Sequence, residues 1–204
     1  MFFSQMGKIA LIVIVVLAAV LGFSCVGSYN KLVQKGQAVD GQWAQVENAY
    51  QRRADLVPNL VATVKGAANF EKDTMIAVTE ARAKVGQVSA QATAQVVNDP
   101  EALKRFQQAQ DGLSSALSRL LVVSEKYPDL KATQNFRDLQ AQLEGTENRI
   151  SVERMRFNEA AQDFNTARNS FPTVAMAGMS DSRFVEKAYF KAQADAATAP
   201  KVQF

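Results

Sequence analysis

The sequence of 204 residues contains no histidine and only one cysteine. Without histidine, Ser-His-Asp and Cys-His nucleophilic systems, His-ligated zinc and the commonest general base near neutral pH are excluded. A lone Cys25 can form neither an intrachain disulfide nor a thiolate zinc cluster. An enzyme made from this chain would have to use carboxylates, lysine or tyrosine. We therefore predict a protein that is not an enzyme, with no metal and no cofactor.

An excess of one charge is also missing. The chain has 23 Lys and Arg residues against 20 Asp and Glu residues, and the basic residues are scattered along it. Nucleic-acid-binding proteins concentrate basic residues on one face or along one stripe. We predict no nucleic-acid partner.

Residues 9–27 form the one long run without charge, IALIVIVVLAAVLGFSCVG. As a helix this run would span roughly 28 Å, which matches the hydrocarbon core of a bilayer. We predict a transmembrane helix or signal-anchor at 9–27 that contacts membrane lipid and follows a short flank at 1–8. Lys8 lies on one side of the span and Lys31 and Lys35 on the other, so charge does not decide orientation. The resemblance to a signal-anchor favours a periplasmic or extracytoplasmic domain.

Two alternatives for this segment remain open. GFSC at 22–25 resembles a lipoprotein cleavage box with Cys25 as the lipidated residue, although Gly22 and Phe23 differ from the usual residues. A cleaved secretion signal is the other alternative. The anchor and the lipoprotein would both keep the domain at a membrane.

Proline is scarce, and most prolines mark predicted helix boundaries. From residue 29 onward helix formers dominate, and no strand-like alternation persists. Asp99 followed by Pro100 is typical of a helix start, and YPDLKA at 127–132 and FP at 171–172 are further breaks. We predict an anchor that continues into a helix at about 5–67, helices at about 70–97, 100–126 and 130–170, and a loosely ordered tail at 173–204.

Apolar periodicity predicts that residues 28–172 form a helical bundle. In the last helix one seam repeats every seven residues, at Phe136, Leu143, Ile150, Phe157, Phe164 and Phe171. In the first helix Val39, Trp43, Val46, Tyr50, Val57, Leu60 and Val64 form a stripe. We predict an all-α protein with an N-terminal transmembrane helix and a long antiparallel bundle. The length of the seams and the Ala-rich second helix favour a homo-oligomer.

RRADLVPNL at 52–60 interrupts the first stripe with charge. The stripe passes through Arg53, so a guanidinium points into the bundle and needs acceptors, and Glu144 and Glu147 of the last helix can supply them. Pro58 should kink the helix. The alternative is an anion site formed by Arg52 and Arg53. The predicted interhelical polar layer comprises Arg52, Arg53, Asp55, Glu144 and Glu147.

Two other polar sets lie on the last helix. Asn158 and Asn165, seven residues apart, would lie side by side and either bond across helices or face solvent. Glu144, Glu147 and Glu153 have a spacing that could serve a di-metal bundle, but the Glu-x-x-His pair of such proteins is missing. A carboxylate hydrolase would need two of them buried with separated pKa values.

Several blocks together resemble the LemA family: YNKLV (29–33), VDGQWAQVENAYQRRADLVPNLVATVKG (39–66), EARAKV (80–85), EKYPDLKATQNFRDLQAQLEGTENRI (125–150) and RFNEAAQDFNTARNSFP (156–172). The resemblance implies a bacterial membrane protein with one transmembrane helix and long antiparallel helices, and it carries over no established enzymatic activity. We predict a self-associating, membrane-anchored scaffold or interaction protein of the cell envelope, with other envelope proteins as further partners. The alternatives are a lipid-organising protein and an adaptor in envelope stress and membrane-protein quality control.

Overall fold

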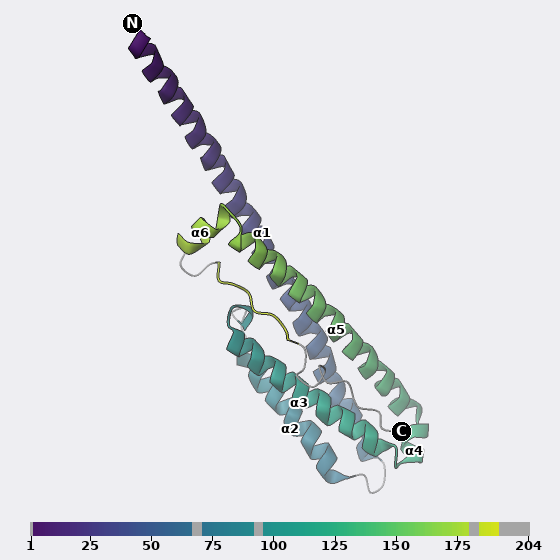
Figure 1. The fold of residues 1–204 in the computed structure, drawn as a ribbon. Coiled ribbons are helices and arrows are strands. Elements are labelled where there is room, and N and C mark those ends of the chain that lie inside the picture. Colours follow the sequence, from purple (N-terminus) through teal and green to yellow (C-terminus); the bar gives the residue numbers. More distant parts are fainter. Residues whose placement is uncertain (1, 67–70, 92–95, 180–183, 192–204) are drawn as a thin grey trace, which may run out of the picture.

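The computed structural model of the chain describes residues 2–66, 71–91, 96–179 and 184–191. Within these ranges the chain is helical apart from short connections and the segment 184–191, and the α5 helix runs back antiparallel to α1 (Figure 1). The prediction of an all-α protein with a long apolar N-terminal helix and an antiparallel bundle is confirmed.

The first helix, α1 (Phe2–Lys65), contains both the apolar run and the first bundle stripe. At 1.5 Å per residue it is about 96 Å long. It continues through Pro58, whose ring is exposed, so the lost backbone hydrogen bond faces solvent. The N-terminal part projects from the bundle (Figure 1), and large apolar side chains between Ile9 and Val26 are 50–82% exposed. Among the described residues this is the helix long and apolar enough to cross a membrane.

The second helix, α2 (Lys72–Gln91), is shorter than the predicted 70–97, and Val96–Asn98 form the short 3-10 helix η1. The prediction at 92–95 lies outside the described residues. Helix α3 (Pro100–Ser124) begins as predicted, because Asp99 caps it by accepting a hydrogen bond from the Glu101 N–H at 2.9 Å. Helices α2 and α3 pack against each other (Figure 1).

The predicted helix at 130–170 is two helices. Helix α4 (Pro128–Ala132) ends at Thr133, whose backbone is extended, and α5 (Gln134–Asn169) starts after it. The Thr133 hydroxyl donates to the Leu130 carbonyl at 2.7 Å and so supplies a partner for the end of α4. The break turns the chain so that α5 can run along α1.

The heptad seam of α5 forms the centre of the core. Phe136, Leu143, Ile150, Phe157 and Phe164 are at most 6% exposed. Phe171, in contrast, is 84% exposed because α5 ends at Asn169, two residues before it. The core has two clusters, one around Trp43 and Phe157 nearer the projecting part of α1 and one around Leu60 and Leu113 nearer the opposite end.

The tail differs from its prediction over the described residues. Residues Thr173–Met179 form α6 beside α1 and α5 (Figure 1). Residues 184–191, which we call the strap, lie along the bundle, with Phe184, Ala188 and Phe190 buried in the first core cluster. The predicted loose order at 180–183 and 192–204 lies outside the described residues.

Candidate functional site

The polar layer around Arg53 lies at the middle of the bundle. Arg53 is 1% exposed. Its Nη1 donates to Ser114 Oγ at 2.5 Å and to Glu147 Oε2 at 2.9 Å, and its Nη2 donates to the Gln110 carbonyl at 3.0 Å and to Gln110 Oε1 at 2.6 Å. One guanidinium therefore joins α1, α3 and α5.

This layer separates the two apolar clusters of the core, which end at Tyr50 on one side and begin at Leu56 on the other along α1. A buried guanidinium is costly unless acceptors surround it, and here four acceptor atoms do. The Arg53 guanidinium carbon also lies 5.2 Å from the centre of the Tyr50 ring. Burial raises the pKa of Tyr50. The hydrogen bonds of the layer connect one level of α1 with α3 and α5.

The other residues predicted for this layer lie elsewhere. Arg52 is exposed, Asp55 accepts a hydrogen bond from Gln51 at 2.7 Å, and Glu144 accepts one from Gln140 at 3.2 Å. They occupy other faces of α1 and α5, so the layer draws on Arg53 and Glu147 from the predicted set. Ser114 and Gln110 of α3 were not predicted, although Gln110 lies between Phe106 and Leu113 in the three- and four-residue spacing of the buried face of α3.

The geometry also bears on the alternatives for this region. Arg53 is enclosed by acceptors of the protein itself, so an anion site formed with Arg52 would have to displace them. Cys25 lies half-buried on α1 within the uncharged run, and its lipidation stays a prediction.

The three carboxylates of α5 do not share a site. Glu153 is buried, accepting from Gln42 Nε2 at 2.7 Å and from Arg156 Nη1 at 3.3 Å. Glu144 is exposed and the Glu147 side chain is 51% exposed. The burial of two carboxylates, which the hydrolase alternative requires, is therefore missing. Among the described residues no group of three His, Cys, Asp or Glu residues is placed to hold a metal ion.

Asn158 and Asn165 bind the strap instead of bonding across helices or facing solvent. Asn165 Oδ1 accepts from the Lys187 N–H at 2.8 Å, and its Nδ2 donates to the Lys187 carbonyl at 2.9 Å. Asn158 repeats this pattern with Phe190 at 2.9 and 3.0 Å. Seven residues of helix rise about 10.5 Å, which is the length of about three extended residues. The heptad spacing of the asparagines therefore matches a nearly extended strap.

Side chains fix the strap on both sides. The Phe190 ring stacks on Trp43 with ring centres 6.1 Å apart, and the Arg154 guanidinium lies 4.7 Å from the centre of the Phe190 ring. Lys187 is buried, and its Nζ donates to Asn98 Oδ1 at 2.6 Å. Burial lowers the pKa of Lys187. The aromatic residues Phe184, Tyr189 and Phe190, close together in a tail rich in alanine, were the sequence signal for this strap.

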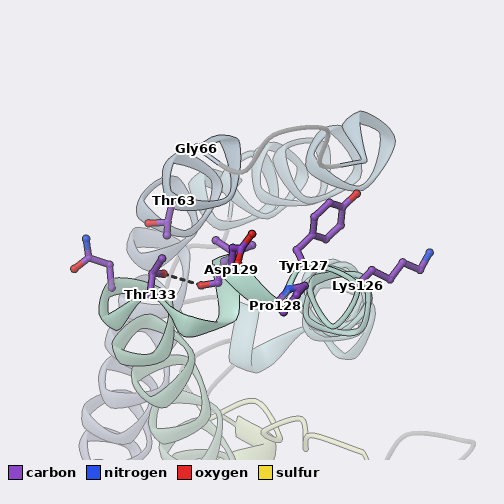
Figure 2. Close-up of a pocket in the computed structure, with 9 residues that line it drawn as sticks. Thr63, Gly66, Lys126, Tyr127, Pro128, Asp129 and Thr133 are labelled. Carbon is purple, nitrogen blue, oxygen red and sulfur yellow. Dashed lines mark hydrogen bonds between the residues drawn. The ribbon is translucent and has the colours of Figure 1, made fainter.

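A pocket lies at the end of the bundle farthest from the projecting part of α1. It has a volume of about 640 Å³. Figure 2 shows Thr63 and Gly66 at the end of α1 on one side and Pro128, Asp129 and Thr133 on the other. YPDLKATQNF supplies most of this lining, which consists of Thr63, Gly66, Lys126, Tyr127, Pro128, Asp129, Leu130, Thr133 and Asn135.

Ion pairs hold the helix ends that surround this distal pocket. Lys126 Nζ lies 3.0 Å from Glu71 Oε1 and joins the end of α3 to the start of α2. The hydrogen bond and charge of Lys126 hold the pKa of Glu71 below its usual value. Lys131 pairs with Glu125 across the turn into α4. The pocket walls combine apolar side chains, such as Leu130 and Pro128, with hydroxyl, amide and carboxylate groups.

Together these features define a class: an all-α bundle whose first helix begins with an apolar segment consistent with a single-pass membrane anchor. The family comparison gives the particular member of that class. The LemA family model matches residues 42–204, and the chain belongs to the LemA family, which is not known to be enzymatic. The match includes the Arg53 layer, the distal pocket and the strap.

Curated relatives are similar at lower identity. The chain is 25% identical over 181 residues to magnetosome protein MamQ of Magnetospirillum gryphiswaldense, which covers 82% of this chain and 66% of that protein. It is 23% identical over 155 residues to protein LemA of Metamycoplasma hominis, and the match covers 76% of this chain and 66% of that protein. It is 26% identical over 158 residues to magnetosome protein MamQ 2 of Paramagnetospirillum magneticum, and the match covers 71% of this chain and 58% of that protein. The chain thus spans just under two thirds, or less, of the length of these relatives.

Proposed function

We propose that this protein is a non-enzymatic, membrane-anchored scaffold or interaction protein of the bacterial cell envelope that associates with itself and with other envelope proteins. The observation that carries this proposal is the continuity of α1. The uncharged run at 9–27 and the buried stripe from Val39 to Val64 belong to one helix. A bundle whose core helix is also its anchor cannot move independently of the membrane.

This arrangement sets the position of the distal pocket. Lys65 lies about 57 Å along the helix axis from Gly27. The rod would therefore present the distal pocket at a fixed height above the bilayer. Its walls suit a polar segment of another envelope protein, because Asp129, Thr133 and Asn135 offer both donors and acceptors.

In-cell photo-cross-linking tests the distal pocket as a partner site. A photoreactive amino acid in place of Asn135 should give a discrete cross-linked species. The same photoreactive amino acid in place of the exposed Ser151, in the middle of α5, should not. Equal cross-linking patterns from the two positions would remove the pocket from the proposal.

Self-association is supported by apolar surface outside the core. A groove of about 270 Å³ runs between α1 and α2 and is lined by Val61, Met75 and Ile76, the last 42% exposed. On α5, Val152 and Met155 are 40% and 55% exposed. The mass of the detergent-extracted full chain should exceed that of one chain plus its detergent. A monomer mass at every concentration would contradict self-association.

Lipid organisation is the second candidate function, favoured by the apolar side chains near the start of the bundle, Phe171 above all. Full-length protein reconstituted into vesicles at increasing density should then change vesicle diameter in electron micrographs. Vesicle diameters that stay constant at every protein density would contradict this function.

A further inference from the structure

We propose that the anchor-side end of the bundle is a second membrane contact, at which Phe171 and Val174 enter the bilayer interface and Lys31 binds the phosphate of an anionic phospholipid. The inference rests on the proposed anchoring through residues 9–27. It adds a lipid-binding surface that belongs to the bundle itself.

The apolar part of this surface is the turn between α5 and α6 together with the start of α6. Phe171 is 84% exposed and Val174 is 45% exposed. A single exposed apolar side chain on a soluble domain needs no explanation. The position of Phe171 and Val174 does need an explanation, because Phe171 lies at the same end of the bundle as the base of the projecting apolar helix.

The height of this turn follows from the residues that share a cavity with it. A cavity of about 330 Å³ is lined by Ser28 and Lys31 of α1 and by Phe171 and Thr173. Ser28 and Lys31 lie about 2 and 6 Å beyond Gly27 along the helix axis. The polar layer outside the hydrocarbon core is about 5–8 Å thick on each side of a bilayer. The cavity and Phe171 therefore fall within the headgroup layer.

The electrostatics fit an anionic headgroup. Lys31 is exposed and forms no ion pair with the described residues, whereas the neighbouring Lys35 pairs with Asp163 at 2.8 Å. A lysine next to a membrane span is attracted by acidic lipid. An aromatic ring beside such a lysine is the side chain that settles at the boundary between headgroups and acyl chains.

Figure 1 shows α6 beside α1 at the level where the projecting segment meets the bundle. At the opposite end of the bundle, Val122 of α3 is 70% exposed. Val122 therefore provides a matched exposed apolar position that the bilayer should not reach.

The test uses the full chain in lipid nanodiscs and places a tryptophan at each end. Phe171→Trp and Val122→Trp each add one fluorophore to Trp43, the single native tryptophan, which is buried about 24 Å beyond Gly27 along α1. Discs made with brominated phospholipid quench tryptophan that enters the interface. We expect the emission maximum of Phe171→Trp to lie at a shorter wavelength than that of Val122→Trp. The emission intensity of Phe171→Trp should also fall in brominated discs, and that of Val122→Trp should not.

The headgroup is tested by comparing discs of phosphatidylcholine alone with discs that contain phosphatidylcholine and phosphatidylglycerol in equal amounts. Quenching of Phe171→Trp should be stronger in the anionic discs. Adding Lys31→Gln should remove this difference, whereas adding Lys65→Gln at the distal end should keep it. If both lysine substitutions behave alike, the headgroup assignment is overturned.

Three results would overturn the membrane contact, and each has a different meaning. Equal quenching of the two tryptophans in protein that co-purifies with discs would leave the anchor standing and reject the second contact. A blue shift without quenching would show that protein, such as a second copy, covers Phe171. Elution of the protein apart from the discs would reject the anchor and this inference together.

Discussion

Asn165 and Lys187 are joined by a reciprocal pair of hydrogen bonds between the asparagine amide and the lysine backbone, at 2.8 and 2.9 Å. Both residues are buried. The helix side chain here takes the place of a neighbouring strand, since it satisfies both backbone groups of a strap residue that lies in no sheet. The strap is therefore part of the bundle and not an appended tail.

Asn165→Ala should release this part of the strap. Loss of the amide leaves two buried backbone groups of Lys187 without these partners, which should destabilise the fold by about 2–4 kcal/mol. Hydrogen exchange at the Lys187 amide should accelerate, and the melting temperature should fall. Asn148→Ala, at an exposed position of the same helix, is the control. Unchanged exchange at Lys187 would show that other contacts hold the strap.

Arg53→Ala should be strongly destabilising, by about 3–5 kcal/mol, because it leaves the buried Gln110 and the partly buried Ser114 without their donor. Glu147→Gln should cost less, because the Glu147 side chain is half exposed. The double variant should lose less stability than the sum of the single variants, as measured by thermal unfolding.

The control for this cycle is Glu144→Gln. Glu144 bonds to Gln140 and not to Arg53, so its effect should add independently to that of Arg53→Ala. Coupling of Glu144 to Arg53 as large as that of Glu147 would contradict the geometry of the layer.

Glu47→Gln should stabilise the fold at neutral pH. Burial raises the pKa of Glu47 above its usual 4.5, so the folded chain holds this proton more tightly than the unfolded chain. The resulting stabilisation is complete below about pH 4.5 and is lost as pH rises through the folded-state pKa. The variant should therefore melt higher than wild type at pH 7, and the gap should close below about pH 4.5.

The exposed Glu159→Gln is the control for this pH series, and its melting temperature should follow wild type at each pH. A gap between Glu47→Gln and wild type that stays constant with pH would show that packing and not ionisation sets the difference.

Phe157→Ala and Phe171→Ala test whether burial or sequence repeat sets the importance of a seam residue. The two positions belong to one seven-residue series, but Phe157 is 0% exposed and Phe171 is 84% exposed. Phe157→Ala should cost about 3–5 kcal/mol, and Phe171→Ala should change the free energy of unfolding of the detergent-solubilised protein very little. Similar losses at both positions would mean that Phe171 packs in solution.

Local patterns were enough to predict several features of the site. The three- and four-residue spacing of α1 predicted that Arg53 points inward, and the heptad seam of α5 put Glu147 within its reach. The capping signal at Asp99 and Pro100 located the start of α3. Each of these depends on residues within a few turns of one helix, where side-chain direction follows from helix geometry alone.

Features that combine distant segments could not be predicted in this way. The same heptad rule wrongly placed Phe171 in the seam, because the rule does not include the helix end at Asn169. The pairing of Asn158 and Asn165 with the strap joins residues 32 and 22 positions apart, and the strap itself has no periodicity that identifies it.

The sequence by itself determined the uncharged span at 9–27, the all-α class and the faces that α1 and α5 bury, because apolar periodicity acts within single helices. Only the tertiary structure decided which acceptors surround Arg53, that the YPDLKATQNF segment meets the end of α1 in a pocket, and that residues 184–191 complete the core. These depend on the rotation and offset of packed helices, which are set by the summed fit of many side chains and not by any one segment.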